Sequence, residues 1–347
     1  ERAAGVFTER DVARSVEHWK AVRAPEEVTR SALEAGPDVA PSVAHERGET
    51  RELIEARARA EVRDVVRHRR AVYAVRGASR YDGRLMTLRF VLCAEDILSA
   101  TLARDLCDRV VAERAHADWL RALWSPEHRD SQRRWTGLDE DPWWSDRHFC
   151  DRRAERAGIA GHFRVRETGR LKAYHGVAGL AYRTVKLAAT LSPPPDLLVL
   201  AGDTDGQEDP ERLRRAGVEG AGESLPVVVA EPAREAEAWV VAGFVPRNDA
   251  EYGRLRAVER ELGFDPTACS ERLLSAVTGD RRDAKRVCRA LLGADHVSPH
   301  DERARACWLD TPLDVLAAHG RRNGLAEYLV EVERVLLPRL GDDGRRA

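Results

Sequence analysis

The sequence lacks a long apolar run: no stretch approaches about 18 consecutive apolar residues, whereas a membrane-spanning helix needs about 20. A membrane-spanning class of protein is therefore not expected. The six cysteines form no CxxC pair and no Cys/His spacing typical of a metal site. A chain of 347 residues does not depend on disulfides for its stability, so reduced thiols and a cytoplasmic location are expected.

The sequence also lacks a leader segment in which basic residues precede an apolar stretch. It begins at Glu1 and its only methionine is Met86, so we expect that the natural start has been trimmed or replaced. The missing leader therefore says little about export. No GxxxxGK[ST] loop is present, so any ATPase that works with this protein is expected to be a separate chain.

Lysine is scarce, at four of 57 basic residues, and the rest are arginine. Codon usage in a GC-rich genome is the preferred explanation, and bidentate phosphate contacts are the alternative. The 57 basic residues are balanced by 59 acidic ones, which leaves a net charge of −2. Any surface for nucleic acid must therefore be a local patch.

The length and composition are those of a soluble globular protein, with 43% hydrophobic and 33% charged residues. About two domains are expected, or one large α/β domain with a substantial insertion. We expect a helical N-terminal segment over 1–80, an α/β domain over 81–245 and a helical region over 246–347. An insertion at about 115–160 holds five of the eight tryptophans. These form either a small hydrophobic core, which is the preferred interpretation, or a platform on which bases stack.

Strands and helices alternate in the α/β domain, which predicts a mainly parallel sheet covered by helices on both faces. Strands are expected over 84–94, 162–166, 196–202 and 225–230. Helices are expected over 97–114, 177–191, 210–216 and 235–244, and then near 250–262, 270–276, 281–292, 311–319 and 324–337.

Acidic residues follow three of the expected strands. Glu95 follows the first strand, Asp203 and Asp205 follow another, and Glu231 follows the last. Functional groups of a parallel sheet collect beyond the carboxyl ends of its strands, so these side chains are expected to meet. Carboxylates that repel one another usually hold a divalent cation, and Mg²⁺, or Mn²⁺ in its place, suits oxygen ligands best. The expected metal ligands are Glu95, Asp203 and Asp205.

Each part of this pattern has an ordinary explanation when it stands alone. Asp-Gly at 205–206 is common turn chemistry, and an aspartate before a helix is a common N-cap. The segment from Asp203 also resembles the start of an EF-hand loop, but Gln207 and Arg214 stand where calcium ligands are required. Calcium sensing is therefore rejected, and the order of acids on successive strand ends favours a Mg²⁺ site.

The order of these acids resembles the Toprim fold, which topoisomerases, bacterial-type primases, recombination-mediator proteins and overcoming-lysogenization-defect nucleases share. Glu95 matches the family glutamate, and Asp203 and Asp205 match its DxD motif. The segment LLVLAGDTDG and the later E-x-E-x-W pattern, with Glu237 and Trp239, are most similar to stand-alone bacterial Toprim-like proteins of unknown function. The chain departs from the pattern because Asp96 follows Glu95 where glycine is usual, and because the Trp-rich insertion is unusual.

This resemblance implies a Mg²⁺-dependent nuclease of DNA, or less preferably RNA, and relatives of this fold are frequent in defence against phage. Glu95, Asp203, Asp205 and Glu237 would be its catalytic residues. Strand passage is not expected, because the tyrosines show no context for a nucleophile. A homo-oligomer or a protein partner is compatible with the sequence. The nearest basic candidates for phosphate contact are Lys172, His175, Arg183 and Lys186.

Two alternatives remain open. The first is a catalytically inactive Toprim-like scaffold or nucleic-acid-binding subunit of a larger complex, which the missing glycine after Glu95 favours. The second is a phosphohydrolase of small nucleotides that uses the same acids. Retention of Asp203 and Asp205 beside Glu237 favours catalysis, because a scaffold has no need of acids that repel one another.

Overall fold

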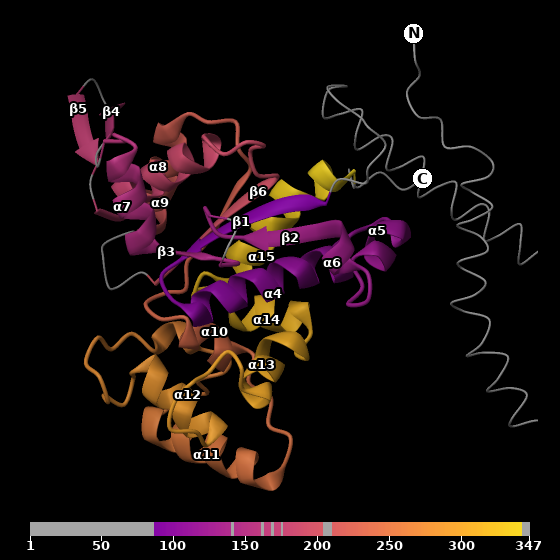
Figure 1. Cartoon of the computed structure of the whole chain (residues 1–347). Coiled ribbons are helices and arrows are strands. Elements are labelled where there is room, and N and C mark those ends of the chain that lie inside the picture. The colour runs from indigo at the N-terminus through magenta and orange to yellow at the C-terminus, as the bar shows by residue number, and fades with distance from the viewer. Residues whose placement is uncertain are drawn as a thin grey trace, which may run out of the picture. The chain divides into compact units, whose positions relative to one another are not determined.

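The computed structural model describes residues 87–139, 142–160, 163–167, 170–174, 176–203 and 210–341 (Figure 1). The expected N-terminal helices within 1–80 lie outside this range. The chain from Thr87 onward forms one compact unit. None of the helices in the described part of the chain is long and apolar enough to cross a bilayer.

A parallel sheet forms the centre of this unit, which confirms the expected α/β architecture. Its strand order is β2-β1-β6-β7, and the short β3 also pairs with β1. The bounds are β1 Leu88–Ala94, β2 Arg133–Thr136, β3 Ser145–Asp146, β6 Leu197–Ala201 and β7 Val227–Ala230. A separate antiparallel hairpin consists of β4 (Phe163–Glu167) and β5 (Arg170–Tyr174).

Helices cover both faces of the sheet, as the continuous apolar strands predict. Phe90 and Leu92 of β1 belong to one core, whereas Val91 and Cys93 belong to the other, as the alternation of side chains along a strand requires. The first core includes α4 (Ile97–Arg114), α10 (Glu237–Ala242) and α15 (Leu325–Leu336). The second lies against α7 (Arg147–Arg156), α8 (Gly176–Ala189) and α9 (Pro210–Ala221).

The C-terminal region is helical and shares the first core with the sheet. Four of its expected helices are present, and α13 was not expected. The segment near 270–276 is not an α-helix: it forms only the 3-10 turn η1 (Ser270–Arg272), because buried Ser270 accepts a hydrogen bond from Asn323 and Leu273 is anchored in the core. The helices are α11 Asp249–Leu262, α12 Ala284–Leu292, α13 Glu302–Leu309, α14 Leu313–His319 and α15, which is followed by the 3-10 turn η2 Leu337–Leu340.

The tryptophans of segment 115–160 are core residues. Trp124 and Trp135 are buried against Phe90, with ring centroids 6.2 and 5.1 Å from it, and three others pack against the same core. The segment also contributes β2 and β3 to the main sheet, together with α5 (Asp118–Leu123), α6 (Arg129–Gln132) and α7. The interpretation of the tryptophans as a hydrophobic core is therefore confirmed, and this core is the main one.

A buried ion pair connects the Trp-rich segment to α4. The Arg133 guanidinium donates to both Asp108 oxygens, at 2.6 and 3.0 Å, and the Trp124 indole N–H donates to the same carboxylate at 3.1 Å. Asp108 is 2% exposed and Arg133 is 7% exposed. The ion pair thus joins β2 of the Trp-rich segment to α4.

We expect Asp108→Ala to lower the free energy of unfolding by about 3–5 kcal/mol, because it leaves a buried guanidinium without its main carboxylate. Urea denaturation at neutral pH measures this. Asp130→Ala is the matched control, since Asp130 also pairs with Arg133, at 2.6 Å, but its side chain is 81% exposed. The control should cost at most about 1 kcal/mol. Equal losses in the two variants would contradict the assignment.

Candidate active site

Glu95, Asp203 and Glu231, three of the acids predicted to meet, follow strands that end at one edge of the sheet. Ala94, Ala201 and Ala230 are in register on β1, β6 and β7, so the three strands end side by side. Glu95 and Glu231 are the next residues after the first and last of these strands, and Gly202 and Asp203 follow the middle one. The strand register therefore brings these carboxylates to the same edge.

Glu95 contacts the chain that carries Asp203. Its Oε2 accepts a hydrogen bond from the backbone N–H of Asp203 at 3.2 Å. Its Oε1 pairs with Arg147, the first residue of α7, at 2.7 Å. A Cβ on Gly202 would lie 3.3 Å from Glu95 Oε2 and from the Arg214 guanidinium, tighter than most Cβ contacts. A larger residue at 202 would therefore force the Glu95 or Arg214 side chain to shift slightly.

Asp203 has an unusual environment for a carboxylate. It is 8% exposed, and the side chain hydrogen-bonded to it is that of another acid, Glu235. Burial, together with the neighbouring Glu235 side chain, raises the pKa of Asp203 to about 9, and the charges of Asp96 and Glu237 act in the same direction. At neutral pH without a cation, Asp203 therefore holds a proton.

Glu237 is the buried first residue of α10. Burial raises its pKa to about 7, and the charges of Glu235 and Asp96 add to this, while Lys285 opposes it. The preceding loop contains Arg234, whose φ of 65° is uncommon for a residue other than glycine. This turn brings Glu235 and Glu237 back toward the strand ends.

Two basic side chains that the sequence did not single out as functional enter this acidic cluster. Lys285 is the second residue of α12, and its Nζ lies 2.6 Å from Glu235 Oε2. Burial alone would lower the pKa of Lys285, but the hydrogen bond to Glu235 and the charges of Glu237 and Asp203 outweigh it and raise that pKa. The C-terminal helices therefore contribute a cation to the site.

Arg214 of α9 is the second such residue. Its Nη1 pairs with Glu231 at 2.8 Å and donates to the Gly202 carbonyl at 2.7 Å, and its Nη2 donates to the Asp203 carbonyl at 2.8 Å. Arg214 is buried, as is Glu231. One guanidinium thus joins the carboxyl ends of β6 and β7 and fixes the backbone of Asp203.

Asp96, which stands where the Toprim pattern usually has glycine, has a structural role. Its Oδ1 accepts the backbone N–H of Ser99 at 2.7 Å, so it is the N-cap of α4. Its charge also contributes to the raised pKa of Asp203. The departure from the family pattern is therefore compatible with a helix that begins directly after Glu95.

The predicted phosphate-contacting residues are placed differently. Arg183 of α8 pairs with Asp151 of α7 at 2.5 Å, and Lys186 pairs with Glu223 at 2.7 Å. Glu223 precedes β7, and α8 leads into β6, so Lys186 lies toward the amino edge of the sheet and not toward Asp203. Only the backbone of Lys172 is described, on β5, and His175 is outside the described residues.

A divalent cation fits the chemistry of this edge. The second acid of the DxD motif, Asp205, lies outside the described residues, and among those described no group of three His, Cys, Asp or Glu side chains is arranged to hold a metal. The buried Asp203 carboxyl and the neighbouring carboxylates nevertheless offer oxygen donors of the kind that Mg²⁺ prefers. Glu95 and Asp203 are the described residues that could hold it.

Comparisons with known proteins give no independent identification. No protein-family model matches the chain. No curated protein and no solved structure matches it either.

Proposed function

We propose that this protein is a divalent-metal-dependent nuclease of Toprim type that hydrolyses phosphodiester bonds, with DNA as the preferred substrate. The observation that carries the proposal is the buried carboxyl of Asp203, held among the acids Glu235, Glu237 and Asp96 at the carboxyl ends of the strands. Gathering acids in this way costs stability, and a bound divalent cation would offset the repulsion that the basic partners leave. The Toprim resemblance supplies the reaction.

The residues of the site have three kinds of role: metal binding, proton transfer and positioning. Glu95 and Asp203, with Asp205, would hold Mg²⁺, which when bound polarises the phosphate and stabilises charge on the leaving oxygen. Glu237, with a pKa of about 7, is suited to accept the proton of the attacking water at neutral pH. Arg214 fixes the Asp203 backbone, and Lys285 limits the repulsion between the acids.

We expect the protein to cleave supercoiled plasmid and single-stranded DNA in Mg²⁺ or Mn²⁺, and not in EDTA. RNA is the comparison substrate. The variant Asp203→Ala/Asp205→Ala should lose cleavage and Mn²⁺ binding by calorimetry. Cleavage that persists in this variant would show that a contaminating nuclease or another site is responsible, and would refute the proposal.

One observation favours the inactive alternative, a Toprim-like scaffold or nucleic-acid-binding subunit. Three acids at the edge already have basic partners, namely Glu95 with Arg147, Glu231 with Arg214 and Glu235 with Lys285. Such pairs can stabilise the edge without a metal. The same experiment decides, because a scaffold would neither cleave DNA nor bind Mn²⁺.

A further inference from the structure

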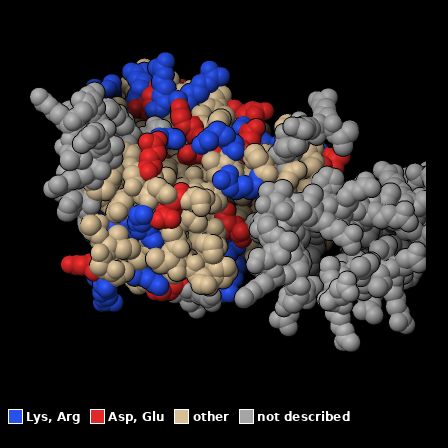
Figure 2. Space-filling model, turned by 90° about the horizontal axis from the view of Figure 1, so that it is seen from above, with Lys and Arg blue, Asp and Glu red and all other residues tan. Residues whose placement is uncertain are grey.

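Basic side chains of the described residues form no continuous surface on the face that Figure 2 shows. Figure 2 shows lysine and arginine intermixed with acidic residues over one face. In the larger pocket, of about 770 Å³ beside β2, arginines have carboxylate partners: Arg133 pairs with Asp108, and Arg305 pairs with Asp105. Its lining nevertheless holds six arginines against three aspartates. It also includes Thr87 and Pro193, which precede β1 and β6, so this pocket lies at the amino edge of the sheet, away from Asp203.

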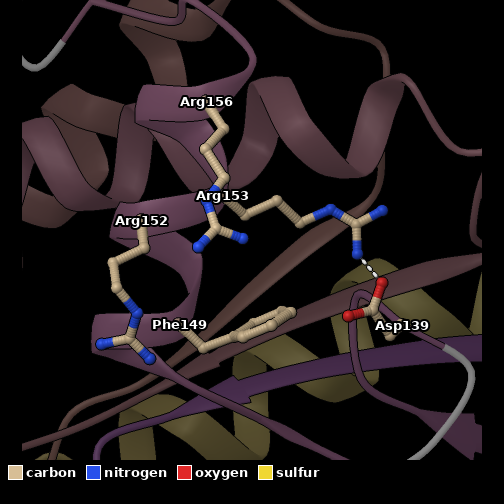
Figure 3. A pocket seen from close by; sticks show the side chains of 5 residues that line it. All are labelled: Asp139, Phe149, Arg152, Arg153 and Arg156. Carbon is tan, nitrogen blue, oxygen red and sulfur yellow. Dashed lines mark ion pairs between the residues drawn. The ribbon is translucent and has the colours of Figure 1, made fainter.

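A smaller pocket on α7 has an excess of positive charge. It measures about 240 Å³ and is lined by Asp139, Phe149, Arg152, Arg153 and Arg156 (Figure 3). Arg153 pairs with Asp139. Arg152 and Arg156 are exposed, and neither forms an ion pair with a described residue. Figure 3 shows the Arg156 guanidinium between those of its two neighbours, above the Phe149 ring.

This pocket lies on α7, the helix that begins beside the acidic edge of the sheet. Asp139 comes three residues after the end of β2, and β2 is the neighbour of β1. Arg147, the first residue of α7, pairs with Glu95. The helix rise of about 1.5 Å per residue places Arg153 about 9 Å along α7 from Arg147. The basic pocket is therefore on a helix whose first residue contacts the acidic edge.

We propose that this pocket on α7 binds a backbone phosphate of a nucleic-acid strand that continues across the acidic cluster. The inference rests on the proposed function for its choice of ligand. Two guanidinium groups with no ion pair among the described residues repel each other across one space, and an anion between them removes this repulsion. Guanidinium also forms bidentate hydrogen bonds with phosphate. The Phe149 ring gives the adjoining sugar or base an apolar surface. Arg152 and Arg156 are thus the strand-positioning residues.

The test is the double variant Arg152→Ala/Arg156→Ala, in which alanine preserves the helix. Its binding to a fluorescein-labelled oligothymidylate is measured by anisotropy in EDTA over a series of salt concentrations. Loss of one single-strand phosphate contact should lower the slope of log K against log salt by about 0.7. We expect affinity at moderate salt to fall about tenfold.

The matched control is Arg256→Ala/Arg260→Ala, which removes two exposed arginines from α11, in the helical region away from this edge. Affinity equal to wild type in the pocket variant, or an equal loss in the control, would overturn the inference. So would a wild-type protein that does not bind the oligonucleotide. Binding is measured in EDTA, which prevents cleavage, so the two proposals are tested separately. A protein that binds through this pocket but never cleaves in Mn²⁺ refutes the nuclease proposal and leaves the phosphate pocket supported.

Discussion

The Asp203→Asn variant is expected to lose metal-dependent cleavage by a factor on the order of a thousand, and yet to be more stable than the wild type without metal. The loss of cleavage follows because a bound cation contributes several kcal/mol to stabilising the transition state, and about 4 kcal/mol corresponds to that factor. Asparagine keeps the shape of the side chain but not the charge that binds Mg²⁺. Initial rates on supercoiled plasmid measure the effect.

The gain in stability follows from the raised pKa. Asp203 has a pKa of about 9 in the folded protein, whereas a free aspartate has a pKa of about 4. In the pH range between these values the folded state binds a proton that the unfolded state releases, so the contribution of Asp203 to stability falls as pH rises from about 4 to about 9. Asparagine removes this dependence. Neutral pH lies about three units above the free value, at about 1.4 kcal/mol per unit, so asparagine should stabilise the metal-free protein by up to about 4 kcal/mol.

Thermal unfolding in EDTA at several pH values tests the second half of this expectation. Asp295→Asn is the control, because Asp295 is exposed and the substitution changes the same atoms. Mn²⁺ should raise the unfolding temperature of the wild type but not that of Asp203→Asn, since only a ligand bound to the folded state stabilises it. A variant less stable than wild type at pH 7 in EDTA would mean that Asp203 is ionised and ion-paired.

Local sequence was sufficient to place the strand ends that carry the acids. The apolar runs that end at Ala94, Ala201 and Ala230 are continuous because both faces of each strand are buried, so the residue after each run could be identified as a strand end. Neighbouring parallel strands then bring Glu95 and Asp203 to one edge. This part of the site needs no knowledge of distant contacts.

The basic partners of the acids could not be found in the same way. Lys285 comes from a helix 50 residues beyond Glu235 in sequence, and nothing local marks it as a residue of this edge. The strand RRWT of β2 was missed because its apolar pattern is weak, and Arg133 is buried there only because Asp108 of α4 neutralises it. α13 did carry a signal, since Asp301 caps it and Ala304, Cys307 and Trp308 have helical spacing.

Arg214→Ala is expected to lower the free energy of unfolding by about 3–5 kcal/mol, because it leaves Glu231 buried without this guanidinium and removes the donors to two carbonyls. Arg214→Lys keeps the charge but cannot make all three contacts at once, so it should fold with an intermediate loss. Urea denaturation measures both. An Arg214→Ala protein as stable as wild type would show that the guanidinium is not needed to join the strands.

The coupling between Arg214 and Glu231 separates this ion pair from the rest of the loss. In a double-mutant cycle with Glu231→Gln, the two changes together should cost about 1–3 kcal/mol less than their sum. The stability that Arg214→Ala still loses in the Glu231→Gln background belongs to the hydrogen bonds with the Gly202 and Asp203 carbonyls. Among the described residues, only the Arg214 side chain donates to these carbonyls. If that part also sets the position of Asp203, Arg214→Lys should cleave DNA more slowly than Glu231→Gln under conditions in which both proteins are fully folded.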